Sequence, residues 1–135
     1  MKFLSYLCLL PVLVACGGPL KYSVPSTARA PGADAKVVAD VSAAQGQTRL
    51  EVEVANLPPP DRVSARATRY TAWYRKNSAA TWSRIGGLEY DDGGRQGTIT
   101  GSVPEVAFDF TVTAEETDSP ASPSPDVILA QRVEN

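Results

Sequence analysis

Histidine is absent from this chain of 135 residues, and cysteine occurs only as Cys8 and Cys16. The absence of histidine excludes catalytic triads that use it, histidine general bases and most zinc sites. The chain also lacks the Gly-x-Ser-x-Gly and Ser-x-x-Lys nucleophile motifs and a phosphate loop ending in Lys-Ser/Thr. We therefore expect no catalytic residue, no metal ligand and no cofactor, and predict that the protein is not an enzyme.

The first sixteen residues have the layout of a secretory signal peptide. Lys2 gives a positive start, and the following stretch to Ala15 is nearly all apolar. It is shorter than the about 20 apolar residues of a transmembrane helix. The sequence Leu13-Val14-Ala15-Cys16 resembles a bacterial lipobox, which implies cleavage before Cys16 and lipidation of that residue. The alternative is a plain signal peptide with a chance cysteine at the cleavage point.

The predicted anchor determines the expected location and partners. Lipoprotein families use an aspartate after the acylated cysteine for retention in the inner membrane, so Gly17 favours the outer membrane. The chain has 13 Lys and Arg against 15 Asp and Glu, and loss of Lys2 leaves 12 against 15, a net charge of −3. This charge gives no reason to expect a nucleic-acid partner. We expect the membrane, through the lipid anchor, and an envelope protein as partners.

The composition divides the chain into three parts. Residues 1–15 are the predicted lipoprotein signal peptide. Residues 16–35 contain Pro19, Pro25 and Pro31 among small polar residues and are predicted to form a flexible tether. Residues 36–135 are predicted to form one folded domain.

Alternation of apolar and polar residues dominates the predicted domain. Leu50, Val52 and Val54 alternate with charged residues, and an apolar face also repeats every second residue at 37–41 and 108–112. Further strands are predicted at 68–76, 81–85, 88–90, 98–103 and 127–133, with a Pro/Ser-rich loop at 117–126. About seven short strands predict an all-β fold, an antiparallel β-sandwich of the immunoglobulin/fibronectin-III-like class. A small barrel is the alternative.

A family resemblance agrees with this fold. The series Tyr70-Thr71-Ala72-Trp73-Tyr74, Ile85-Gly86-Gly87-Leu88, Phe108 to Glu115, the Pro/Ser-rich loop and Val127-Ile128-Leu129 resembles the extracytoplasmic C-terminal domain of sigma-K-type anti-sigma factors. The resemblance covers roughly residues 68–130. It implies a sandwich in the cell envelope. It does not imply sigma-factor inhibition, because a shared fold does not transfer function.

Two acidic pairs are candidate ligand or acid–base groups. Asp91 and Asp92 could offer oxygen ligands to calcium, but Asp-Asp-Gly-Gly is typical of a hairpin turn. Glu115 and Glu116 are adjacent, so on a strand they point to opposite faces and cannot form an acid–base pair. We expect both glutamates to be solvated charges at a strand end.

Arginines and aromatic residues gather between positions 62 and 84. Their types are those enriched at binding hot spots. On the strand at 68–76, Arg69, Trp73 and Arg75 share one face, and Arg84 follows nearby. These four residues are the predicted binding face. The alternative places Trp73 inward, as is usual for a large aromatic residue in a sandwich.

The sequence therefore predicts a non-catalytic, lipid-anchored envelope lipoprotein that acts as a protein-interaction or assembly module. The alternative is a small-ligand or calcium-binding envelope sensor that uses the Asp91-Asp92 turn.

Overall fold

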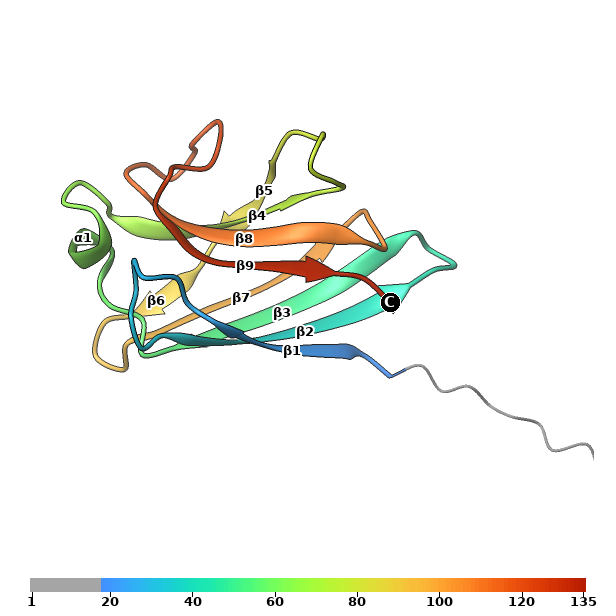
Figure 1. The fold of residues 1–135 in the computed structure, drawn as a ribbon, viewed down its shortest axis with the longest axis horizontal. Helices are drawn as coiled ribbons and strands as arrows, with labels where there is room; N and C mark the ends of the chain where they lie inside the picture. The colour runs from blue at the N-terminus through green and yellow to red at the C-terminus, as the bar shows by residue number, and fades with distance from the viewer. Residues whose placement is uncertain (1–17) are drawn as a thin grey trace, which may run out of the picture.

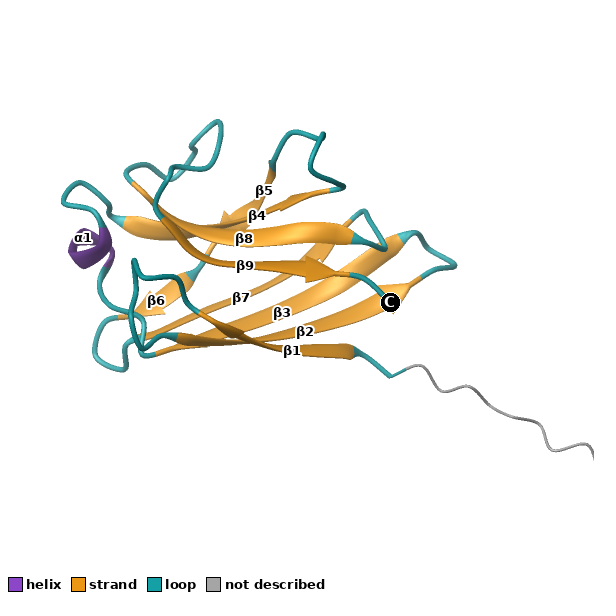
Figure 2. Ribbon diagram, viewed as in Figure 1, coloured by secondary structure: helices purple, strands orange, loops and turns teal. Residues whose placement is uncertain are grey.

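The computed structural model describes residues 18–135, so the predicted signal peptide and Cys16 lie outside the described residues. The described chain is almost entirely strand and turn (Figures 1 and 2). Its elements are β1 (Leu20–Pro25), β2 (Asp34–Ser42), β3 (Gln47–Ala55), α1 (Pro60–Val63), β4 (Arg69–Arg75), β5 (Ser83–Gly87), β6 (Glu89–Asp91), β7 (Gln96–Val103), β8 (Phe108–Glu115) and β9 (Val127–Val133).

The strands form two separate sheets. Sheet A has the order β1-β2-β3-β7-β6, and sheet B has the order β5-β4-β8-β9. All neighbouring strands are antiparallel. The sheets lie over one another as two layers (Figure 1). The predicted all-β sandwich is confirmed, with nine strands in residues 18–135 instead of about seven.

The predicted tether over residues 16–35 is wrong for most of its length. Leu20 to Pro25 form an edge strand that pairs with β2, and Val24 is buried. The following loop buries Ala30 and Ala33 in the same core. Proline is tolerated in an edge strand, because a backbone nitrogen on the open side of the strand does not have to donate to the sheet. The sandwich therefore begins at Leu20, not at residue 36.

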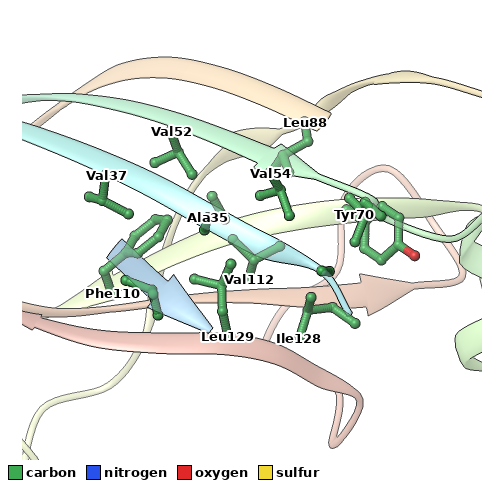
Figure 3. Packing of buried hydrophobic residues seen from close by; sticks show 14 of the residues in the cluster. Ala35, Val37, Val52, Val54, Tyr70, Leu88, Phe110, Val112, Ile128 and Leu129 are labelled. Atoms are coloured by element: carbon green, nitrogen blue, oxygen red, sulfur yellow. The ribbon is translucent and has the colours of Figure 1, made fainter. Parts of the chain in front are cut away.

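The core lies between the two sheets. Every second residue of β3 is buried, including Leu50, Val52 and Val54, as the alternation predicts. Phe108, Phe110 and Val112 of β8 face them from sheet B and are fully buried. Figure 3 shows valines of sheet A packed against Phe110 and Leu129 of sheet B. Burial of these side chains is the main source of stability, at about 1.5–3 kcal/mol for each large residue.

Hydrogen bonds between sheet edges close one side of the sandwich. The N–H of Thr27 donates to the carbonyl of Ile128 at 2.7 Å. The hydroxyl of Tyr22, on β1, donates to the carbonyl of Glu134 at 3.2 Å. The first strand and the last strand of the chain are thereby fastened together, which ties the N-terminal segment into the domain.

A short helix, α1, follows the proline run at one end of the sandwich. Proline cannot donate to a ladder, so Pro58-Pro59-Pro60 prevents β3 from extending beyond Ala55. Pro60 stands at the start of the helix, where proline is tolerated. The helix buries Pro60 and Val63. Its four residues are too few for a helical period, which explains why the sequence pattern does not predict it.

Candidate functional site

The predicted binding residues lie on the outer face of sheet B, which faces away from sheet A. Alternation along β4 directs Tyr70 and Ala72 to the core and Trp73 to the opposite face. Trp73 is nevertheless only 1% exposed. Trp73 is therefore not a surface residue among arginines. It is buried, as the alternative expects of a large aromatic residue, but it lies on the outer side of sheet B and outside the core cluster.

A chain of hydrogen bonds runs through this buried outer face. The Nε1–H of Trp73 donates to Oγ1 of Thr113 at 2.9 Å, and that hydroxyl donates to Oε2 of Glu115 at 2.9 Å. The backbone N–H of Ser124 donates to the same carboxylate oxygen at 3.0 Å. We call Trp73, Thr113, Glu115 and Ser124 the outer polar cluster. Each of the polar groups in this hydrogen-bond series has a partner, which offsets the cost of removing it from water.

The environment of Glu115 also differs from the prediction. It was predicted to be a solvated charge, but it is only 5% exposed, whereas Glu116 is exposed. The two glutamates do point to different surroundings, as their adjacency requires. Glu115 is buried because the chain after β8 turns back and places the Ser124 N–H on its carboxylate.

The predicted Pro/Ser-rich loop, residues 117–126, contributes Ser124 to the outer polar cluster and covers its other members. The hydroxyl of Ser124 donates to the carbonyl of Ala114 at 2.6 Å, and the N–H of Ala114 donates to the carbonyl of Asp126 at 3.0 Å. The guanidinium of Arg84 on β5 donates to the carbonyl of Asp118 at 2.8 Å. Arg84 therefore holds the loop in place over Trp73, its register partner on β4.

Beside the covered region lies an open groove of about 370 Å³, which we call the outer groove. Its polar wall is a three-residue ion-pair network. Nε of Arg75 lies 2.9 Å from Oδ2 of Asp109, and Nη1 of Arg132 lies 3.2 Å from Oδ1 of the same carboxylate. Arg132 also donates to the carbonyl of Lys76 at 2.8 Å. This network fixes the arginines on strands instead of leaving them free to rotate.

An aromatic side chain forms the apolar part of the groove. The guanidinium carbon of Arg75 lies 4.3 Å from the ring centroid of Trp82, which is a cation–π contact. Thr111 and Ala130 form the floor between these groups. The groove therefore presents a half-buried tryptophan, two arginines and one carboxylate to solvent.

The electrostatics of Asp109 follow from this arrangement. Burial raises the pKa of Asp109, but hydrogen bonds from Arg75 and Arg132 outweigh burial and hold the pKa below its ordinary value of 3.8. Burial lowers the pKa of the Arg132 guanidinium, but hydrogen bonds to Asp109 and Glu134 outweigh burial and hold that pKa above its usual range. Asp109 is therefore ionised at neutral pH and serves as an acceptor, not as an acid.

The structure brings together part of the predicted binding face. Arg75 lines the outer groove and Arg84 holds the covering loop, whereas Arg69 is exposed at the start of β4. Asp109 and Arg132 were not among the predicted site residues. Alternation along β8 could have found Asp109, because it points away from the face that carries Phe108 and Phe110. Arg132 carries no comparable signal, since its place depends on how β9 pairs with β8.

In the Asp91-Asp92 pair, Asp91 is the last residue of β6 and Asp92 is the first residue of the turn to β7. Oδ1 of Asp91 accepts a hydrogen bond from the N–H of Gly93 at 3.1 Å, which is the side-chain contact of an Asx turn. Within residues 18–135, no group of three or more possible ligand side chains is close enough together to hold a metal ion.

No protein-family model, curated protein or solved structure matches the chain. No helix in the described part of the chain is long and apolar enough to cross a membrane.

Proposed function

We propose that this protein is a non-catalytic, lipid-anchored envelope lipoprotein that acts as a protein-interaction module, with the outer groove as its contact surface. The observation that carries the interaction is the groove itself, in which Trp82 lies under Arg75 beside Asp109 and Arg132. Tryptophan and arginine are enriched at interface hot spots. A groove of about 370 Å³ is large enough to receive a few side chains of a partner.

The ion pairs that hold Arg75 and Arg132 in place reduce the entropy cost of binding a partner. An arginine that is already held by a carboxylate loses little side-chain entropy when a partner docks. Asp109 compensates part of the charge of Arg75 and Arg132, so the groove suits a partner surface with mixed polar and apolar groups. The stacked Trp82 supplies apolar area that a partner can cover.

The proposed anchor is close to the folded domain. Cys16 precedes the first residue of β1, Leu20, by four positions. Four extended residues span at most about 14 Å. A lipidated Cys16 would therefore keep the sandwich near the bilayer, in the outer membrane by the Gly17 argument, and would restrict the search for partners to the envelope. The resemblance to the extracytoplasmic anti-sigma domain supports the same compartment.

The anchor and the groove are tested in one experiment. Cells that express the native chain or Cys16→Ser are labelled with a palmitate analogue, and a photo-crosslinking amino acid is placed at Trp82. The matched control carries the crosslinker at Thr100, an exposed position on sheet A. We expect label that requires Cys16 and a discrete protein adduct only from position 82. Absence of label overturns the anchor, and equal adducts from both positions overturn the groove as the contact surface.

A further inference from the structure

A second concave site lies at the end of the sandwich that carries α1. It has a volume of about 370 Å³, and three arginines line it, Arg29, Arg62 and Arg95. We call it the distal cleft. The three residues come from the loop between β1 and β2, from α1, and from the turn between β6 and β7, which lie at the same end in Figure 1.

The positive charge of the distal cleft is only partly compensated. Arg29 lies 3.2 Å from the carboxylate of Asp126. Within residues 18–135, neither Arg62 nor Arg95 has an ion-pair partner within 4.0 Å. The arginines thus gather at one site of a chain whose net charge is −2. Guanidinium groups bind carboxylates through two parallel hydrogen bonds. Two neighbouring arginines without an ion-pair partner therefore favour a carboxylate-bearing ligand.

Apolar surface lies beneath these arginines. Pro31 and Pro58 provide this surface, and Asn56 and the buried Leu57 complete the lining of the cleft. The carbonyls of Pro58 and Leu57 accept hydrogen bonds from the hydroxyls of Tyr70 and Tyr90, the second at 2.7 Å. The wall is therefore rigid, and its mixture of charge and apolar area fits a peptide segment better than a small free anion.

Backbone strain is concentrated at the same site. Asn56 and Arg95 are the only non-glycine residues in the described range with positive φ, at 55° and 52°. Both line the distal cleft, and the N–H of Leu57 donates to the carbonyl of Arg95 at 2.8 Å between them. Arginine has no special tolerance for this conformation, whereas glycine adopts it freely. Strained positions cluster at functional sites, so an arginine at position 95 points to a role for its side chain.

The position of the cleft restricts the source of the ligand. Ala55 pairs with Asp34 at the cleft end, whereas Leu20 lies at the opposite end of β1. Leu20 pairs with Ala39, which is five residues along β2 from Asp34, so Leu20 lies about 17 Å from the cleft end. This argument rests on the lipid anchor proposed above, since Cys16 precedes Leu20. Charge on the anchoring bilayer is screened over about 8–10 Å, so its lipid headgroups are too far away to be the ligand.

We propose that the distal cleft binds a carboxylate-rich segment of an envelope protein, as a second contact surface separate from the outer groove. Arg62 and Arg95 bind the carboxylates, and Pro31 and Pro58 contact the apolar parts of the segment.

The test uses the full-length lipoprotein in a nonionic detergent and a short fluorescein-labelled peptide rich in Asp and Glu. A matched peptide carries Asn and Gln at the same positions. We expect binding of the acidic peptide only. Arg62→Ala and Arg95→Gly should each weaken binding about tenfold or more, because each removes a charged hydrogen-bond donor. Arg49→Gln removes the same charge from an exposed site on β3 and should leave affinity within about twofold.

Arg95→Gly also separates binding from folding. Glycine relieves the positive φ at position 95, so the melting temperature should be unchanged or higher while affinity falls. Unchanged affinity in both Arg62→Ala and Arg95→Gly overturns the proposal. Binding of inorganic phosphate or anionic phospholipid vesicles in preference to the acidic peptide also overturns it, in favour of a small anion or a lipid. Neither result bears on crosslinking at Trp82, so the proposed function stands or falls separately.

Discussion

The two faces of β8 are buried by different means. On the inner face, Phe108, Phe110 and Val112 pack against sheet A and have no exposed surface. On the outer face, Thr111, Thr113 and Glu115 are buried almost as completely, but their side chains make hydrogen bonds. Segment 117–126 covers Thr113 and Glu115. Alternation thus assigns side chains to faces correctly, while polarity fails to identify which face meets solvent.

The comparison also separates two energetic roles. Apolar burial on the inner face supplies free energy in proportion to area. The outer polar cluster contributes less net stability, because its hydrogen bonds replace bonds to water. When a mutation removes one member of the cluster, the remaining buried polar groups lose a hydrogen-bond partner, and the free energy of unfolding falls. The outer cluster therefore fixes the position of a loop, whereas the inner face holds the domain together.

The largest expected effect is on the inner face. Phe110→Ala removes a fully buried ring between the sheets and should lower the free energy of unfolding by about 3–5 kcal/mol. Urea unfolding followed by tryptophan fluorescence measures this change. Thr100→Ala, on an exposed part of β7, is the control and should stay within about 0.5 kcal/mol. A loss below about 1 kcal/mol for Phe110→Ala would contradict the assignment of the core.

The next effect is on the outer polar cluster. Thr113→Val keeps the volume but leaves the Trp73 N–H without an acceptor and removes a donor from the Glu115 carboxylate. We expect a loss of about 1–3 kcal/mol in the free energy of unfolding and faster proteolysis within segment 117–126. Thr100→Val is the matched control. If Thr113→Val costs as much as Phe110→Ala, the two faces do not differ in the way described.

The smallest effect is at the open groove, where the ion pairs are partly solvated. Asp109→Asn should cost about 1 kcal/mol or less at pH 7, because the Asp109 side chain is 24% exposed. The folded-state pKa of Asp109 is lowered, so its ionised form stabilises the fold above pH 3.8, and this contribution is lost as the pH falls through the folded pKa. The stability difference between wild type and Asp109→Asn should therefore shrink below pH 3.8.

That pH dependence is measured by urea titrations of both proteins at neutral pH and at several values below pH 3.8. Glu51→Gln, in an exposed pair with Arg49, is the control and should show little difference at any pH. A difference between wild type and Asp109→Asn that grows as the pH falls would contradict the ion-pair network.

The sequence predicted the strands more accurately than their environment. Alternation at Leu50, Val52 and Val54 placed β3 correctly, because one sheet face is apolar and the period of a strand is two. Short proline-containing β1 was missed, since proline and small polar residues are also typical of a tether. Its strand character depends on pairing with β2, and pairing is not a property of the segment alone.

For the candidate site, too, some features follow from the sequence alone and others depend on the tertiary structure. The sequence by itself determined the all-β class, the alternation that directs Asp109 away from Phe108 and Phe110, and the residue types that could bind a partner. Only the tertiary structure decided that Trp73 and Glu115 are covered, that Trp82 and Arg132 join Arg75 in one groove, and that three arginines meet at the opposite end. The physical reason is that a side chain's direction follows from local backbone geometry, whereas its burial and neighbours depend on segments far away in the chain.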